Sequence, residues 1–161
     1  MKTENLHFTY NVYESGLDLP PGDNELLEAA RKVTAKAYAP YSRFLVGAVA
    51  KLKNGAIISG TNQENASYPV GICAERTLLS VAAMEQKDVP IDTIAISYHN
   101  VNGESTGPIS PCGMCRQSLS EYEERTRQPI RLILSGQSGK VFVLESAGLL
   151  LPLSFGGEHL K

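Results

Sequence analysis

The chain has 161 residues, of which 42% are hydrophobic and 20% charged, and its formal net charge is −2. This composition is that of an ordinary globular protein rather than a disordered one, and the length suits one domain with one sizeable core. The lack of an apolar run of ~20 residues, of a signal-peptide core and of a Lys/Arg-rich stretch favours a cytoplasmic protein that acts on a small molecule, with no membrane or nucleic acid partner.

The N-terminal part of the chain predicts an extended segment followed by a helix. Weak alternation of apolar residues indicates an edge strand or an arm, so we expect residues 1–22 to precede a single domain that spans residues 23–161. Apolar residues then recur at helical spacing, and Asp23 or Asn24 provides an N-cap. Pro40 is expected to end this helix.

The rest of the chain alternates between strand and helix patterns. Asn54-Gly55 separates two apolar runs within residues 44–60, which predicts an antiparallel hairpin. Pro111 is expected in the first turn of a helix, where its missing N–H has no helical partner. The other predicted elements are a helix at 73–84, a strand at 91–98, a helix through 112–124, strands at 130–135 and 141–144, and a short helical piece at 146–150. This order predicts an α/β protein, a three-layer α/β/α sandwich whose mixed sheet has about five strands.

Three cysteines need a chemical explanation. An odd number argues against a disulfide framework, and the two-residue gap between Cys112 and Cys115 is typical of metal knuckles and redox motifs. Cys73 also falls at a predicted helix start, where oriented N–H groups favour thiolates. Two helix starts that face each other would form a soft tetrahedral zinc site with an open fourth position, which is the pattern of catalytic zinc. A structural zinc site stays open as the alternative, and His159 as a fourth ligand would close it.

Two charged residues follow Cys73 closely. Glu75 is expected to reach a water molecule at the metal without binding the metal itself, and so to act as a general acid and base. Arg76 is expected to offset the charge of three thiolates by donating hydrogen bonds to them. Taken alone, Arg76 also fits an exposed helix charge.

Several stretches carry a family resemblance. "C-A-E" and "P-C-G-M-C" resemble the paired zinc motif of nucleoside deaminases. "YAPYSRFLVGA", "GTNQENASYPVGICAERT", "SPCGMCRQ" and "LLPLSF" resemble, in order and spacing, the signature blocks of the small homotetrameric cytidine deaminases, over residues from about 30 to 158. The resemblance implies one Zn²⁺ per subunit and the hydrolytic deamination of cytidine and deoxycytidine to uridine and deoxyuridine in pyrimidine salvage. It also implies a homotetramer whose active sites are shared between subunits.

The resemblance assigns roles at the metal. It implies that Cys73, Cys112 and Cys115 are the zinc ligands and that Glu75 carries protons from water to N3 of the base and to the leaving amine. From the geometry of a helix start alone, we expect the backbone N–H of Ala74 to hold O2 of the base.

The resemblance also assigns the contacts of the nucleoside. Asn62 and Glu64 of the "NQEN" block would bind the ribose hydroxyls. Phe44 would pack beside the nucleoside, and Phe155 would stack on the base from a neighbouring subunit. The loop residues that also reach a neighbour's site in the family are Ala66 and Tyr68. Without the resemblance, the amide and carboxylate would fit a capped turn and the two phenylalanines would fit a core.

Other functions share parts of this pattern. A polynucleotide deaminase, such as a tRNA adenosine enzyme, usually begins its motif with His and has a more basic surface. A blasticidin-type deaminase shares both cysteine motifs, and a non-catalytic module would bind zinc without releasing ammonia. "NQEN" and "LSF" favour the free nucleoside, and cytidine above all.

Overall fold

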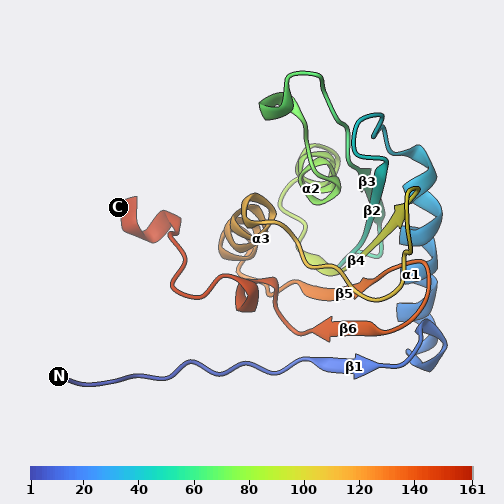
Figure 1. Ribbon diagram of the computed structural model, residues 1–161. Helices are drawn as coiled ribbons and strands as arrows, with labels where there is room; N and C mark the ends of the chain where they lie inside the picture. Colours follow the sequence, from blue (N-terminus) through green and yellow to red (C-terminus); the bar gives the residue numbers. More distant parts are fainter. Residues whose placement is uncertain (161) are drawn as a thin grey trace.

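A mixed β-sheet of six strands forms the centre of the computed structural model, which describes residues 1–160 (Figure 1). The strands are β1 (Asn11–Tyr13), β2 (Phe44–Leu52), β3 (Ile57–Thr61), β4 (Ile91–Asn100), β5 (Arg131–Ser135) and β6 (Val141–Leu144). Their order across the sheet is β1-β6-β5-β4-β2-β3, with β4 and β5 parallel and every other pair antiparallel. The predicted number of about five strands was too low by one. The additional strand is β1, three residues of the N-terminal segment that pair with β6 at the edge, so the edge strand, one of the two alternatives predicted for that segment, is present.

Helices cover both faces of this sheet (Figure 1). α1 (Pro21–Val33) packs on one face through a cluster that includes Leu27 and Ile133. α2 (Ala74–Glu85) and α3 (Gly113–Thr126) pack on the other face over a larger cluster. The predicted three-layer α/β/α sandwich is therefore confirmed. No helix within residues 1–160 is both long enough and apolar enough to cross a membrane.

Two predicted helix starts and one predicted end were wrong. α1 begins at Pro21, and its N-cap is Pro20 rather than Asp23 or Asn24. The earlier start is favourable because a proline suits the first helical turn. The Asp23 carboxylate instead accepts two hydrogen bonds from Arg131, at 2.7 and 2.8 Å. α1 ends at Val33 and continues as a 3₁₀ turn, Thr34–Lys36, so the helix has finished before Pro40. In α3 the N-cap is Cys112, and Pro111 lies outside the helix.

The connections between strands bring two helix starts to the same region. The predicted hairpin is confirmed, with β2 and β3 joined at Asn54-Gly55, where Gly55 has a φ of 87°. α2 then joins β3 to β4, and α3 joins β4 to its parallel neighbour β5. Both helices lie on one face of the sheet, and their N-termini meet there with Cys73 and Cys112 as their N-caps.

Candidate active site

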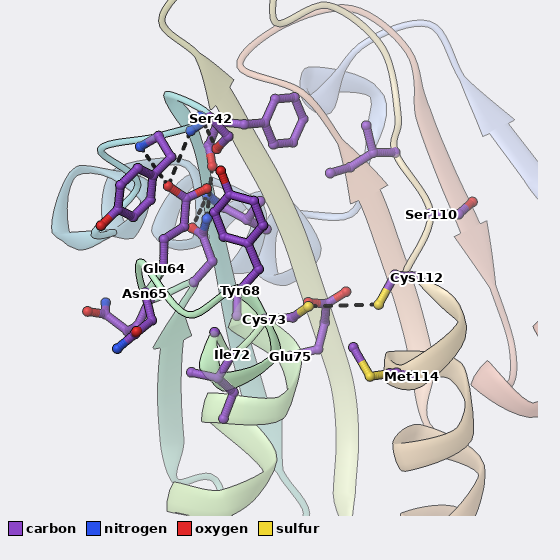
Figure 2. A pocket seen from close by; sticks show the side chains of 18 residues that line it. Ser42, Glu64, Asn65, Tyr68, Ile72, Cys73, Glu75, Ser110, Cys112 and Met114 are labelled. Carbon is purple, nitrogen blue, oxygen red and sulfur yellow. Dashed lines mark hydrogen bonds between the residues drawn. The ribbon is translucent and has the colours of Figure 1, made fainter.

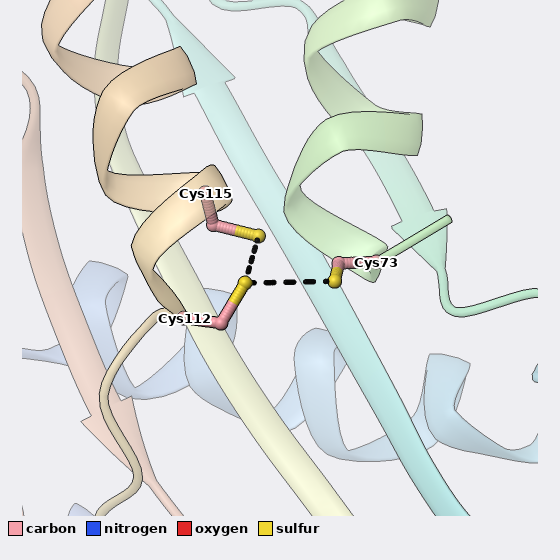
Figure 3. A group of neighbouring side chains, drawn as sticks. All are labelled: Cys73, Cys112 and Cys115. Carbon is pink, nitrogen blue, oxygen red and sulfur yellow. Dashed lines mark hydrogen bonds between the residues drawn. The ribbon is translucent and has the colours of Figure 1, made fainter. Parts of the chain in front are cut away.

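Three thiols converge where α2 and α3 begin (Figure 3). The sulfur of Cys112 lies 3.8 Å from that of Cys73 and 3.4 Å from that of Cys115, and all three sulfurs lie within 4.8 Å of one another. A tetrahedral zinc with Zn–S bonds of about 2.3 Å separates its sulfurs by about 3.8 Å, so the donor set and its spacing fit that ion. Among the described residues this is the one cluster of potential metal ligands. His159 is not part of this cluster, and its ring stacks on Phe155 with the ring centroids 5.4 Å apart. The open fourth position at the metal stays a prediction.

The surroundings of the thiols shift the pKa values of Cys73 and Cys115 in opposite directions. A hydrogen bond shared with Cys115 lowers the pKa of Cys73 to about 6, helped by Cys112 and by the charge of Arg76 and opposed by burial. The same shared hydrogen bond and burial raise the pKa of Cys115 above its ordinary value. One thiol therefore ionises readily, and a metal ion would displace the protons of the others as it binds.

Glu75 lies beside this cluster in the first turn of α2. Only 5% of the residue is exposed, and burial raises the pKa of its carboxyl above the ordinary value. A carboxyl with a raised pKa holds and releases a proton closer to neutral pH than an exposed one does. The position and environment of Glu75 therefore suit proton transfer next to a metal.

Arg76 lies in the first turn of α2, after Glu75. Its side chain lines a smaller hollow between α2 and α3, together with Ser80 and Glu121. The positive charge still contributes to the lowered pKa of Cys73. The hydrogen bonds of the described residues include none from Arg76 to a sulfur, and charge compensation of metal-bound thiolates by Arg76 stays a prediction.

A cavity of about 650 Å³ opens beside the thiols (Figure 2). Figure 2 shows Ser110, Cys112 and Met114 on one side and Glu64, Asn65 and Tyr68 on the other, with Cys73 and Glu75 between them. Eight of the residues singled out from the sequence line the cavity: Phe44, Asn62, Glu64, Tyr68, Cys73, Ala74, Glu75 and Cys112. Phe155 and Ala66 do not line it, and both are exposed.

The polar wall of the cavity is held by hydrogen bonds to the backbone. The Asn62 carbonyl oxygen accepts from the N–H of Val46 at 2.7 Å, and its amide nitrogen donates to the carbonyl oxygen of Phe44 at 2.9 Å. Oε2 of Glu64 accepts from the N–H groups of Tyr41 and Ser42, at 2.9 and 3.2 Å. These side chains therefore brace the backbone and also line the cavity, and ribose binding by the "NQEN" block stays a prediction. Each keeps unused hydrogen-bonding capacity for a ligand, including Oε1 of Glu64.

Aromatic residues occupy the same end of the cavity. Phe44 is half-buried and stacks on Tyr98, with ring centroids 4.8 Å apart and an angle of 14° between the rings. Tyr68 is 76% exposed and meets the edge of Tyr41 at 6.1 Å. Phe155 is 59% exposed on the C-terminal tail, so within one chain it has neither a core role nor a place in the cavity.

Several residues of the site carried too weak a signal in the sequence. Ser110 and Met114 line the cavity, and the one sequence feature that could have indicated this is that each lies two residues from Cys112. Tyr41 and Ser42 act on Glu64 through backbone N–H groups, which no side-chain pattern reveals. Arg116 donates to the carbonyl oxygens of Pro111 at 2.8 Å and Leu150 at 3.1 Å, and so fixes the segment before Cys112.

Comparison with known sequences gives a consistent result. Residues 21–128 match the sequence profile of the cytidine and deoxycytidylate deaminase zinc-binding region. A cytidine deaminase from Halalkalibacterium halodurans is 38% identical over 136 residues, which are 84% of this chain and 96% of the relative. A blasticidin-S deaminase from Bacillus cereus is 34% identical over 151 residues, which are 91% of this chain and 96% of the relative.

A solved structure agrees with these sequences. The crystal structure of cytidine deaminase from Burkholderia pseudomallei is 41% identical and superposes with a TM-score of 0.70. The superposition covers 81% of this chain and 97% of that one. The fold and the three-thiol site therefore agree with one family.

Proposed function

Because this chain belongs to the zinc-binding cytidine and deoxycytidylate deaminase family, we propose that it hydrolyses cytidine and deoxycytidine to uridine and deoxyuridine with release of ammonia. It is an enzyme of the hydrolase class with one zinc site, to which the ligands are Cys73, Cys112 and Cys115. The observation that carries the assigned reaction, a hydrolytic deamination, is the buried carboxyl of Glu75, which faces a cavity beside a three-thiol cluster. A nucleoside fits a cavity of about 650 Å³.

The metal and Glu75 have different roles in the reaction: the metal activates water and Glu75 transfers protons. Zinc, when bound, supplies the Lewis acid that activates a water molecule for attack on C4 of the base. Glu75 takes one proton of that water and passes it to N3. It then takes the remaining proton from the hydroxyl added at C4 and gives it to the exocyclic amine, so that the C4–N4 bond breaks, ammonia leaves and C4 keeps a carbonyl oxygen. The raised pKa of Glu75 suits both transfers, since the carboxyl holds the proton between them. We expect the N–H of Ala74 to bind O2 of the base, since Ala74 lies at the start of α2 and lines the cavity.

The ribose binds at the polar wall. Asn62 and Glu64 face the cavity with unused hydrogen-bonding capacity, and the backbone contacts described above hold both side chains still. A ligand without the matching hydroxyl would leave these half-buried groups unpaired, which favours nucleosides over free bases. Phe44 packs beside the bound nucleoside.

The active enzyme is a homotetramer in which neighbours complete each site. Phe155 supports this assembly because it is exposed and lies outside the cavity of its own chain, yet its position is fixed. Gln117 donates to the Phe155 carbonyl oxygen at 2.9 Å, and the carboxylate of Glu124 accepts from the N–H of Gly157 at 3.1 Å. Tyr68 and Ala66, exposed on the loop beside the cavity, complete the contact with a neighbour.

Two further assignments accompany this function. Residues 23–161 form the catalytic domain and residues 1–22 its N-terminal extension, a division supported by the family match that begins at residue 21; Lys161 lies outside the described residues. A cytoplasmic location is supported by the three free thiols, because a reducing compartment keeps metal-binding cysteines from forming disulfides.

Blasticidin S is the second candidate substrate. The relative that acts on it covers 91% of this chain, and the two cysteine motifs are common to both activities. "NQEN" supports cytidine, since its Asn and Glu line the cavity where a ribose would bind.

The decisive experiment replaces Glu75 with Gln. The zinc-loaded wild type and Glu75→Gln are each mixed with cytidine, deoxycytidine and blasticidin S, and absorbance, ammonia and zinc per chain are measured. We expect the wild type to release one ammonia per uridine formed. We expect Glu75→Gln to keep its zinc and lose at least roughly 10²-fold in rate, because proton transfer is removed while the ligands stay in place.

Glu85→Gln is the matched control, since Glu85 is an exposed carboxylate at the far end of the same helix. It should retain wild-type activity. A wild type that binds zinc but releases ammonia from none of these compounds would contradict the proposed function. An active Glu75→Gln variant would contradict the role of Glu75.

A further inference from the structure

A buried tyrosine lies directly behind one wall of the cavity. Tyr98 is 7% exposed and sits near the end of β4, opposite Val46 of β2. Tyr98 is on the sheet face that α2 and α3 cover. Ile96, two residues before it on β4, points to the same face, and Ile96 and its partner Ala48 on β2 belong to the core under those helices. Tyr98 does not itself line the cavity.

The ring of Tyr98 supports Phe44. The two rings are nearly parallel, at 14°, with centroids 4.8 Å apart, so one face of Phe44 rests on Tyr98. Phe44 also lines the cavity, where its ring packs beside the nucleoside. A ring held from behind keeps one orientation, whereas an unsupported ring at a half-buried position samples several rotamers.

The hydroxyl of Tyr98 supports a second wall. It donates to the carbonyl oxygen of Thr106 at 3.1 Å, in the loop between β4 and α3. The same loop continues into Ile109 and Ser110, which line the cavity, and then into Cys112. The turn between β5 and β6 contacts the same loop, since the N–H of Gln137 donates to the Ser105 carbonyl oxygen at 2.7 Å.

We propose that Tyr98 is a positioning residue that fixes Phe44 and the loop at residues 105–110 relative to each other, and so sets the affinity of the cavity for its nucleoside. The inference rests on the proposed function for the identity of the ligand. Two contacts on one rigid side chain link walls that come from different parts of the chain, one from the start of β2 and one from the loop before α3. Tyr98 lies on a central strand that pairs with β2 and β5, so it is a firm reference point for both.

Tyr98→Phe tests the hydroxyl while keeping the stacked ring. We expect KM for cytidine to rise roughly three- to tenfold, the size of one hydrogen bond, because the loop loses one of its anchors before substrate binds. The kcat and the zinc content per chain should stay close to wild type, since Glu75 and the thiols are untouched. Tyr98→Leu, which also removes the stack, should raise KM further.

Tyr122→Phe is the matched control. Tyr122 is also a buried tyrosine, 4% exposed, and its hydroxyl donates to a backbone carbonyl oxygen, that of Val89. It lies in α3 and does not line the cavity. We expect Tyr122→Phe to lose stability as Tyr98→Phe does while keeping the wild-type KM, which separates a positioning role from a structural one.

Amide hydrogen exchange of residues 105–110, measured without substrate on the zinc-loaded proteins, gives a readout that does not need activity. It should accelerate in Tyr98→Phe and stay unchanged in Tyr122→Phe. A wild type with no deaminase activity would overturn the proposed function, whereas the exchange data would still test Tyr98. An unchanged exchange rate in Tyr98→Phe, or a KM equal to that of Tyr122→Phe, would overturn the positioning role.

Discussion

Glu64 shows how one carboxylate can serve both the fold and the site. It accepts from the N–H groups of Tyr41 and Ser42, which turn the chain into β2, and it faces the cavity. The sequence indicated its ribose role through the resemblance, but not its backbone partners, because those lie 22 and 23 residues away and depend on the folded loop. Cys73 and Glu75 were easier to assign, since their chemistry depends on a short spacing along one helix start.

The pH dependence of stability should reveal the first role of Glu64. Burial alone would raise its pKa, but the hydrogen bonds from Ser42 and from the N–H groups of Tyr41 and Ser42 lower the pKa below the ordinary value. The stabilisation by the ionised carboxylate is therefore complete above the unfolded pKa of about 4.3 and lost as the pH falls through the lower folded value. We expect Glu64→Gln to be less stable than wild type by roughly 1 kcal/mol at pH 6–7 and about equal at the acid end. Urea unfolding at a series of pH values measures this difference.

The control for this experiment is Glu25→Gln, which removes one negative charge from an exposed position in α1. Loss of metal at low pH acts equally on all three proteins, so it cancels in the comparison. A Glu64→Gln deficit that grew toward low pH would contradict the lowered pKa.

At the scale of elements, close packing at Gly60 seats α2 on the sheet. A Cβ at this position of β3 would lie 2.4 Å from the Leu78 nitrogen and 2.5 Å from the Ala74 carbonyl oxygen, both backbone atoms of α2. The helix that begins just after Cys73 therefore approaches the strand as closely as a glycine allows. The sequence predicted both elements from their patterns, but the contact between them depends on three-dimensional packing that no local pattern contains.

Gly60→Ala and Gly47→Ala form a matched pair. A Cβ at Gly47 would lie 2.5 Å from the Ala30 carbonyl oxygen of α1, on the opposite face. We expect each substitution to lower the free energy of unfolding by about 1–3 kcal/mol, because either helix must move away. Only Gly60→Ala should also weaken zinc binding and lower kcat, since it displaces the start of α2. Chelator competition and steady-state kinetics on the folded fraction compare the two; equal zinc affinities would contradict the inferred coupling.

At the scale of the whole molecule, the two ends of the chain were the hardest to predict. β1 is only three residues long, and its pairing with β6 joins opposite ends of the sequence, which a local pattern cannot show. The C-terminal tail was expected to supply Phe155 to the active site of a neighbouring subunit. Within one chain the ring of Phe155 is exposed and does not line the cavity, so a single chain does not test this role.

Mixing two impaired variants tests the proposed shared site. We expect Phe155→Ala to lose about tenfold in kcat/KM, because a stacked aromatic contact with the base is removed. Subunits of Glu75→Gln retain Phe155, so mixed oligomers with Phe155→Ala should contain repaired sites and exceed the summed activities of the two separate proteins. Leu153→Ala, a fully exposed neighbour in the same tail, should keep wild-type activity alone. Purely additive activity from a confirmed mixed oligomer would contradict a site shared between subunits.

The pairing of β1 with β6 also has a consequence for folding during synthesis. Asn11 leaves the ribosome long before Val143, its partner in the sheet, is made, so at about 5–20 residues per second this edge strand waits about 7 to 26 seconds for its hydrogen bonds. The three thiols come from residues that precede both β5 and β6 in the chain. On the nascent chain, all three thiols therefore emerge before the last two strands do, so every metal ligand has been made before the sheet can be completed.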